Sequence, residues 1–287
     1  MAKSDLDMLI CAPDVLFNAR SIEQKIAVDF NNAQDNFSKR AAISKILGDA
    51  NSAARDAIKA AYLTGPFKTR ETTRAYTYLT DQLVKTALTS VIELHHPNPN
   101  PTSSEKISML AVGGYGRGEM APFSDVDLLF LSPYKMTPWA ESVVESTLYV
   151  LWDLKLKIGH STRTVDECLR LGRNDLTIRT ALLEARFLVG DAALAASLDT
   201  KLWKTLFKST GPEFVALKLE EREHRHAKQG ATRFLLEPNV KEGKGGLRDL
   251  QTLFWITKYL SGAKLASEMI YQGFFTKQEI ENFSKAE

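Results

Sequence analysis

Two aspartates separated by one residue, Asp125 and Asp127, stand at the start of an apolar segment that ends at Leu131. Side chains two positions apart on a β-strand point to the same face, so a strand would present both carboxylates together. Two ionised carboxylates this close repel each other unless a cation lies between them. Mg²⁺ prefers oxygen ligands and often binds through one or two carboxylates together with substrate phosphates. The pair therefore predicts a magnesium site, with Asp125 and Asp127 as its catalytic and metal-binding residues.

The loop that precedes this acidic pair is rich in glycine and carries a cation. Gly113 and Gly114 follow a predicted buried strand over 107–112, Arg117 comes three residues later, and Ser124 directly precedes the pair. Glycines at a strand end let a ligand approach the backbone closely, and exposed backbone N–H groups there can hold phosphate oxygens. An arginine fork suits the same ligand. We therefore expect these four residues to contact a phosphorylated substrate.

Each of these features also has an ordinary structural explanation. An isolated Asp-x-Asp at a strand edge is usually solvated, and a glycine pair after a strand is usually a turn. Aspartate is depleted in strands, however, and here two aspartates share one face of an otherwise apolar strand. The combination favours a functional site. Gly116-x-Gly118 lacks the third glycine of a dinucleotide-binding loop, and Gly243-Lys244 lacks the Ser or Thr of a Walker loop, so neither motif applies.

A second glycine-rich basic segment lies over 237–246, before a predicted helix over 249–260. Lys241 and Arg248 flank its glycines and are candidate ligand-binding residues. The start of the helix could bind an anion. Asp249 could instead cap the helix. The sequence leaves both possibilities open.

The remaining pattern indicates which elements must position these residues. Helical periodicity predicts a helical layer over the first hundred residues, after a poorly ordered lead-in over 1–20, and Gly48 is expected to end the first helix. A small sheet with helical cover follows. The charged run over 222–226 is predicted to be a solvated helix face. The predicted helices are 21–47, a second one ending at Leu63, 70–94, 137–154, 175–188, 191–207, 212–229 and 249–260, and the predicted strands are 107–112, 125–131 and 157–165.

These elements predict an α+β protein in which a small mixed β-sheet core is flanked by helical N-terminal and C-terminal parts. The expected division is 1–105, 106–190 and 191–287. Cys11 and Cys168 are too few for a disulfide framework or a Cys-based zinc site, which favours a reducing, cytoplasmic compartment. Helical sequence continues to the last residue without a stop signal, so we expect a truncated chain.

The charge balance excludes some broad classes of protein. Lys and Arg number 37 and Asp and Glu number 35 in the 287 residues, which gives a formal charge of +2. A general DNA-coating or membrane-surface protein works through a large basic excess, so we expect neither nucleic acid nor a membrane as a partner. No apolar run is long enough to span a bilayer, and no secretory leader is expected.

The stretch from Gly113 to Asp127 resembles the nucleotidyltransferase superfamily related to DNA polymerase β. More narrowly, it resembles the bifunctional uridylyltransferase/uridylyl-removing enzymes of bacterial nitrogen regulation. Three further stretches agree with that family, namely 159–164, 183–191 and 237–251. The resemblance extends from about residue 107 to residue 260, and it implies a nucleotidyltransferase core within 106–190.

The resemblance implies a Mg²⁺-dependent transfer of UMP from UTP to a tyrosine hydroxyl of the PII signal protein, with release of pyrophosphate. In this family Gly113 and Gly114 would position the β- and γ-phosphates, and Arg117 would stabilise developing charge. Removal of UMP is the task of a separate metal-dependent domain with a His-Asp dipeptide. This sequence contains no His-Asp dipeptide, so we expect transferase chemistry only.

One departure from the superfamily concerns the third metal ligand. A third carboxylate usually lies on the next core strand, but the predicted strand over 157–165 carries none. Asp166 at its end is the favoured substitute, and Asp153 is the alternative. Two other functions remain open. One is nucleotidyl transfer to another acceptor, and the other is a module that binds a nucleotide or a partner without turnover.

Overall fold

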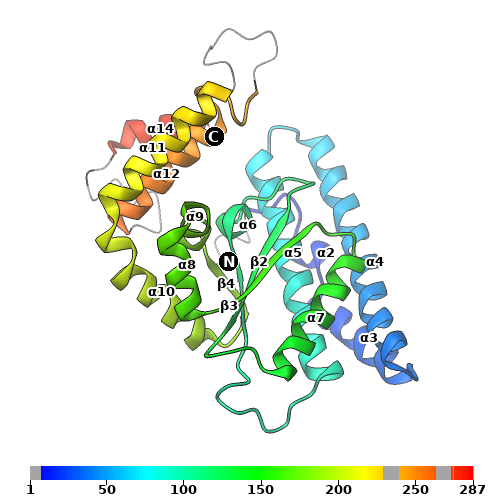
Figure 1. Ribbon diagram of the computed structural model, residues 1–287. Coiled ribbons are helices and arrows are strands. Elements are labelled where there is room, and N and C mark those ends of the chain that lie inside the picture. Colours follow the sequence, from blue (N-terminus) through cyan, green and yellow to red (C-terminus); the bar gives the residue numbers. More distant parts are fainter. Residues whose placement is uncertain (1–7, 229–238, 263–272, 274, 287) are drawn as a thin grey trace. The chain divides into compact units, whose positions relative to one another are not determined.

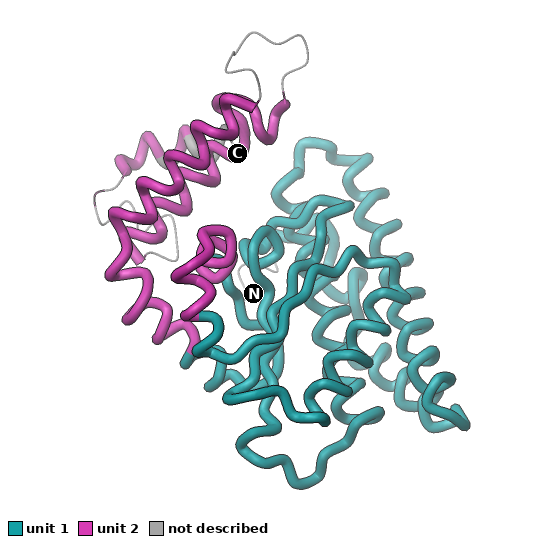
Figure 2. Tube along the Cα trace, viewed as in Figure 1, with its two compact units in different colours: residues 1–168, 184–197 teal, residues 169–183, 198–287 magenta. Residues whose placement is uncertain are grey.

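The structure is a computed structural model that describes residues 8–228, 239–262, 273 and 275–286. It divides into two compact units (Figure 2). The first unit comprises Met1–Cys168 with Glu184–Ser197, and the second comprises Leu169–Leu183 with Leu198–Glu287. The three-part division expected from the sequence is a different partition, and it stays a prediction.

The first unit begins with a helical layer, as predicted, but its helices break at different residues. Asp35 accepts a hydrogen bond from the Ser38 N–H at 2.8 Å and so starts a new helix. Gly48 lies inside that helix, where a single glycine weakens a helix without ending it. The lead-in over 1–20 was expected to be poorly ordered, but its described part contains a short helix and the start of a second one, and Leu16 is buried there. The helices are α2 (Pro13–Leu16), α3 (Ala19–Asn32), α4 (Asn36–Thr64) and α5 (Thr69–Ser90), followed by the π-helical turn η1 (Val91–His95).

A four-stranded mixed sheet follows this layer, which confirms the predicted α+β class. Its strand order is β3-β2-β1-β4, with β1 antiparallel to both neighbours and β2 parallel to β3. The parallel pair is joined by α7 (Pro138–Asp153), because parallel strands need a crossover connection. Thr137 caps α7 as predicted, by accepting a hydrogen bond from the Ala140 N–H. The strands are β1 (Ser108–Ala111), β2 (Val126–Ser132), β3 (Ile158–Thr164) and β4 (Arg186–Gly190).

The fourth strand was not predicted. The sequence indicated a helix over 175–188, but α9 ends at Leu183 and the chain then forms β4. β4 pairs with β1, and it supplies the neighbour that the backbone of β1 needs on that side. The pairing of a short apolar run with a distant strand is a tertiary effect that overrides local helical periodicity.

One face of the sheet packs against helices of the first unit. Met109 of β1 and Phe130 of β2 are completely buried in this core. α5 and α7 lie along the same side of the sheet (Figure 1). Full burial of a side chain of this size contributes about 1.5–3 kcal/mol, so this layer fixes β1 and β2 firmly. Helix residues in the core include Leu79, Leu83, Leu88, Val143, Leu148 and Leu151.

The second unit is helical in its described residues. Phe214 of α11 (Gly211–Lys228) stacks on Tyr259 of α12 (Leu247–Ser261), with ring centroids 3.8 Å apart. Within the described residues, α10, which begins in the first unit, and α11 and α12 confirm the helices predicted over 191–207, 212–229 and 249–260, while residue 229 lies outside those residues. No described helix combines the length and the apolar composition that crossing a bilayer requires. The helices from residue 165 onward are α8 (Val165–Asn174), α9 (Leu176–Leu183), α10 (Ala192–Thr205), the 3-10 turn η2 (Phe207–Ser209), α11 (Gly211–Lys228), α12 (Leu247–Ser261) and α14 (Lys277–Ala286).

Candidate functional site

The two predicted carboxylates lie at the start of β2. The strand begins at Val126 rather than at Asp125, so Asp127 belongs to the sheet and Asp125 lies just before it. Asp125 is exposed, whereas Asp127 is half-buried. Burial, and then the charge of nearby Asp125, raise the pKa of Asp127 above its usual range. This environment disfavours two negative charges unless a cation offsets them.

Two glycines make room for the Asp127 carboxylate. Asp127 pairs with Gly159 of β3, and a methyl group at Gly159 would overlap Oδ1 of Asp127. Gly113 has a φ of +57°, and a methyl group there would lie 3.4 Å from Oδ2. A larger residue at 159 would therefore push the carboxylate out of its position. The predicted phosphate-binding glycine Gly113 thus lies directly beside the predicted metal-binding carboxylate.

The glycine-rich loop contains a short helix that the sequence did not predict. α6 spans Gly113–Arg117 directly after β1, and Gly118 ends it with a φ of 81°. The N–H of Val112 donates to the Asp127 carbonyl at 3.0 Å, which ties the start of α6 to β2. The first N–H groups of any helix lack acceptors within that helix. Those of Gly113 and Gly114 are therefore available to an anionic oxygen.

Arg117 braces this loop through an ion pair. Its Nη1 donates to both carboxylate oxygens of Glu184, at 2.9 and 2.8 Å, and the Glu184 side chain is only 1% exposed. Gly116 permits the approach, since a methyl group there would overlap the Glu184 carbonyl oxygen. Nη2 of Arg117 lies beside Gly114, 3.6 Å from where a methyl group would be. The contact with Glu184 gives Arg117 a bracing role, and its contact with phosphate stays a prediction.

A second buried cluster anchors α6 to α5 and β4. Tyr115 is 1% exposed, and its hydroxyl donates to Asp81 of α5 at 2.8 Å. Arg186 of β4 donates to both oxygens of the same carboxylate and to the carbonyls of Tyr115 and Gly116. Burial, and then the Asp81 charge, raise the pKa of Tyr115 well above its usual value, so its hydroxyl stays protonated. Neither Asp81 nor Glu184 was a predicted site residue, because both lie far from the loop in sequence.

The segment between α6 and the acidic pair is held by the helical layer. The Met120 N–H donates to Thr77 Oγ1 of α5, and Arg55 of α4 donates to the Pro122 carbonyl at 2.8 Å. Ser124 closes a turn, because its Oγ accepts a hydrogen bond from the Ala121 N–H at 2.9 Å. This bond explains the serine structurally. The predicted contact of Ser124 with phosphate is not tested by it.

The candidates for a third carboxylate lie in other local settings. Asp166 occupies the first turn of α8, where the helix dipole favours an acid. Thr164 and Glu167 form a reciprocal capping box at the start of that helix. Asp153 accepts a hydrogen bond from Ser44 of α4 at 2.9 Å. Among the described residues, no group of three or more His, Cys, Asp or Glu side chains is arranged to hold a metal ion.

The donor set at Asp125 and Asp127 nevertheless fits Mg²⁺. Both side chains offer hard carboxylate oxygens, and burial and the charge of Asp125 disfavour an uncompensated negative charge on Asp127 and raise its pKa. Mg²⁺ commonly binds through one or two carboxylates and completes its shell with water and substrate phosphates. In the described residues no Lys, Arg or His forms an ion pair with either carboxylate. The metal ligand set stays a prediction.

The second glycine-rich segment lies in the second unit. Asp249 is the third residue of α12, which begins at Leu247 rather than at the predicted 249, and its carboxylate accepts from the Gly245 N–H at 2.8 Å. Arg225 and His226 of α11 also contact this carboxylate. Burial raises the pKa of Asp249, but the hydrogen bonds from Gly245, His226 and Arg225 together outweigh it and lower that pKa.

These contacts show that part of the charged run over 222–226 is buried rather than solvated. The run over 222–226 was predicted to be solvated, but His226 is only 7% exposed because it packs against Asp249. Arg248 donates to Gln251 at 2.8 Å and lies 3.5 Å from Glu242. Lys241 is exposed, and its N–H donates to Asn239 Oδ1. The predicted ligand contacts of Lys241 and Arg248 stay predictions.

The chain is similar to known proteins over nearly its whole length. A family model described as GlnD PII-uridylyltransferase matches residues 213–287. A protein of Ruegeria pomeroyi named bifunctional uridylyltransferase/uridylyl-removing enzyme is 56% identical over 272 residues, which cover 95% of this chain and 30% of that protein. Proteins of the same name from Cereibacter sphaeroides and Erythrobacter litoralis are 53% and 47% identical over 97% and 91% of the chain. The chain spans 28–30% of the length of these three relatives.

Proposed function

Because this chain is related over nearly all of its length to bifunctional uridylyltransferase/uridylyl-removing enzymes, we propose that it carries the uridylyl-transferring site of such an enzyme. The site would transfer UMP from UTP to a tyrosine hydroxyl of the PII signal protein in nitrogen regulation. A bond forms between the tyrosine oxygen and the α-phosphorus, pyrophosphate leaves, and the phenolic proton passes to water. The relatives' names and the family description support the choice of base and of acceptor.

The observation that carries this proposal is the setting of Asp127. Its carboxylate lies between Gly113 and Gly159, next to Asp125, and burial raises its pKa. Asp125 and Asp127 would hold Mg²⁺. When bound, the ion would offset charge on the triphosphate and favour ionisation of the attacking hydroxyl.

The surrounding residues keep this arrangement rigid. The N–H groups of Gly113 and Gly114 would contact phosphate oxygens beside Asp127. The ion pair of Arg117 with Glu184 and the hydrogen bond of Tyr115 with Asp81 hold α6 in place. A preorganised set of donors contributes to catalysis because it needs little rearrangement as charge develops.

The direct test is a transfer assay with purified protein. The chain would be incubated with Mg²⁺, UTP and PII, and the mass added to PII would be measured and located on a tyrosine. We expect the mass of UMP with the wild-type chain and none with the Asp125→Asn/Asp127→Asn variant. A PII variant with Phe in place of the modified tyrosine serves as the acceptor control, and ATP as the donor control. Equal incorporation by the double variant would refute the role of the carboxylates.

One observation favours a second candidate function, a nucleotide-binding module without turnover. In the described part of the chain no third acidic or His ligand joins Asp125 and Asp127. Such a module would bind UTP with Mn²⁺, as measured by calorimetry, but would add no mass to PII or to any other acceptor. Transfer of UMP to an acceptor other than PII would instead support the proposed enzymatic activity and change only the identity of the acceptor.

A further inference from the structure

One edge of the sheet is unusually regular. In the part of the chain that the structure describes, β3 lies at the end of the sheet and pairs with β2 in unbroken register over all seven residues. The opposite edge strand, β4, has five residues and a register shift against β1. Edge strands are commonly protected by prolines, lysines or bulges. β3 contains no proline, lysine or bulge, and Arg163 is the only residue of this strand that is a Lys, Arg, Asp or Glu.

The backbone of β3 offers hydrogen-bonding groups on its outer side. The Lys157 carbonyl accepts from the Val126 N–H at 2.8 Å, so it faces β2. In a parallel pair, alternate residues direct their N–H and C=O groups to the same neighbour. The groups of Ile158, His160 and Thr162 therefore point away from β2. They form a template on which an extended peptide can add as a fifth strand.

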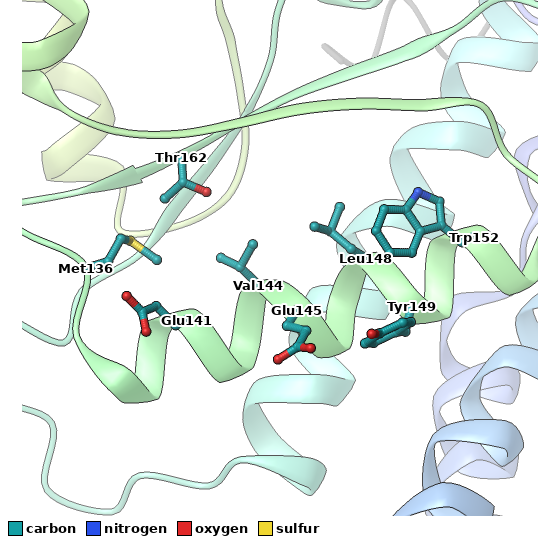
Figure 3. A pocket seen from close by; sticks show the side chains of 8 residues that line it. All are labelled: Met136, Glu141, Val144, Glu145, Leu148, Tyr149, Trp152 and Thr162. Atoms are coloured by element: carbon teal, nitrogen blue, oxygen red, sulfur yellow. The ribbon is translucent and has the colours of Figure 1, made fainter.

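A groove runs beside this edge, between β3 and α7 (Figure 3). Its volume is about 450 Å³. At one end are Tyr149 and Trp152, which are 40% and 44% exposed, and the Trp152 ring contacts His160 of β3. Figure 3 shows Glu141 near the other end of the groove, beside Met136, with Glu145 between the two ends. The full lining is Met136, Glu141, Val144, Glu145, Leu148, Tyr149, Trp152 and Thr162.

The register of β2 and β3 relates this groove to the carboxylates. Asp127 pairs with Gly159, so the odd-numbered residues of β3 share a face with Asp127. Thr162 lines the groove, so the even-numbered residues face α7. A strand added at the edge of β3 would alternate in the same way. Every second side chain would lie on the carboxylate face, and those between would enter the groove.

We propose that the acceptor protein binds as an added strand along the outer edge of β3, with its tyrosine opposite Gly159. The inference rests on the proposed function and names how the acceptor of that same site is held. Residues next to the tyrosine lie against Trp152 and Tyr149. We expect the residue three positions from the tyrosine, opposite Thr162, to be cationic, because Glu141 and Glu145 line the groove there.

Two features of the edge select this occupant. Strands in a sheet are about 4.8 Å apart, so a residue opposite Gly159 on an added strand lies about 10 Å from the backbone of Asp127. Gly159 carries no side chain, and the long side chain of a tyrosine can therefore extend across β3 toward the carboxylates. The groove combines aromatic and acidic side chains, which complement an apolar neighbour and a cation. A folded surface without an extended segment could not use the backbone groups of β3.

The first test blocks the edge itself. Proline at position 160 removes an N–H that points away from β2, and proline is tolerated at such positions of edge strands. We expect His160→Pro to raise the KM for PII at least tenfold, with UTP affinity and the unfolding midpoint preserved. A KM for PII within twofold of the wild-type value, in a folded variant, would overturn the proposal.

The second test leaves the backbone unchanged. We expect Glu145→Lys to raise the KM for PII at least fivefold, whereas Glu23→Lys, an equal change at an exposed residue of α3, leaves it unchanged. A PII variant with Glu three residues from its tyrosine should bind Glu145→Lys better than it binds the wild-type chain. An equal rise in the KM for PII in Glu145→Lys and Glu23→Lys would argue against binding in the groove. So would a PII variant with the added Glu that binds Glu145→Lys no better than it binds the wild-type chain.

A binding readout separates this proposal from the proposed function. Fluorescence anisotropy of labelled PII measures complex formation without transfer. Suppose that the chain transfers no UMP but binds PII, and that His160→Pro weakens this binding. That result would support binding of PII along the edge of β3 and refute the proposed transferase function. If neither His160→Pro nor Glu145→Lys affects transfer of UMP, the proposed transferase function is supported and binding of the acceptor along β3 is refuted. A wild-type chain that neither binds nor modifies PII would refute both.

Discussion

Asp127 and Asp249 are both partly buried aspartates beside glycines, but they differ in the charges around them. Asp127 lies next to another acid, Asp125, and burial raises its pKa. Asp249 accepts from the Gly245 N–H and contacts Arg225 and His226, and these contacts lower its pKa. Asp127 belongs to the first unit and Asp249 to the second.

The difference indicates how a candidate metal-binding carboxylate can be distinguished from a structural one. A structural carboxylate is neutralised by protein cations, as Asp249 is, and as Glu184 is by Arg117 within the candidate site itself. Asp127 has no ion pair of this kind in the described residues, so the folded chain carries repulsion there that an external cation would relieve. The four predictions that follow test this distinction, in order of expected effect.

The largest effect should come from neutralising Asp127. Asp127→Asn should lower uridylyl transfer about a thousandfold or more, because loss of a metal contact removes several kcal/mol of charge stabilisation. It should not lower the unfolding midpoint, because the substitution removes a half-buried charge that lies beside the charge of Asp125. Asp249→Asn should instead lower the free energy of unfolding by about 1–3 kcal/mol, because it weakens the hydrogen bonds that this carboxylate accepts. Thermal unfolding and Mn²⁺ binding of both variants measure the contrast, and a large loss of stability in Asp127→Asn would contradict it.

The next effect concerns the brace of the glycine-rich loop. Glu184→Gln removes the buried carboxylate that pairs with Arg117, and we expect a loss of about 3 kcal/mol in the free energy of unfolding. Asp49→Asn is the matched control, because its ion pair with Lys45 is exposed and such pairs contribute less than about 1 kcal/mol. Denaturant unfolding measures both. Similar losses in the free energy of unfolding of the two variants would mean that the ion pair of Arg117 and Glu184 stabilises the chain no more than an exposed pair does.

A methyl group placed beside the carboxylate should act mainly on function. Gly159→Ala forces Asp127 out of position, and a misplacement of about 1 Å can lower the rate of a positioned reaction about a hundredfold. Gly48→Ala places the same group in open space inside α4 and should stabilise the chain by about 0.5–1 kcal/mol. Transfer rates and unfolding curves are the measurements. Full activity of Gly159→Ala would show that the position of Asp127 is not critical.

The smallest effect is a dependence of stability on pH. The pKa of Asp249 is lowered in the folded chain, so its ionised form contributes stability above its unfolded pKa of about 3.9. That contribution is lost as the pH falls through the lower folded pKa. The wild-type chain should therefore lose stability more steeply below about pH 4 than Asp249→Asn does. Unfolding measured at intervals of pH in this acidic range checks the sign, and parallel curves would contradict it.

Local signals in the sequence predicted many elements correctly. Thr137 followed by Pro138 marked the start of α7, and apolar periodicity marked α5, α11 and α12. The strand that carries Asp127 was predicted within one residue of its start. These predictions succeed because caps, prolines and periodicity act between residues close together in the chain.

Other features could not be predicted from local signals. β4 lies in a segment with helical periodicity, and its partner β1 is about 80 residues away. The Glu184 partner of Arg117 is 67 positions distant, and the Asp81 partner of Tyr115 is 34 positions distant. The capping box of Thr164 and Glu167 was not predicted, although its two residues are only three positions apart.

The sequence by itself determined the kinds of chemical group in the site, which are two acids one residue apart after a glycine-rich basic loop. It also determined the main helices and the class of the fold. Only the tertiary structure decided which of these groups are neutralised within the chain. Charge compensation depends on distances between side chains that lie far apart in sequence, so folding pairs Arg117 with Glu184 and leaves Asp127 between two glycines.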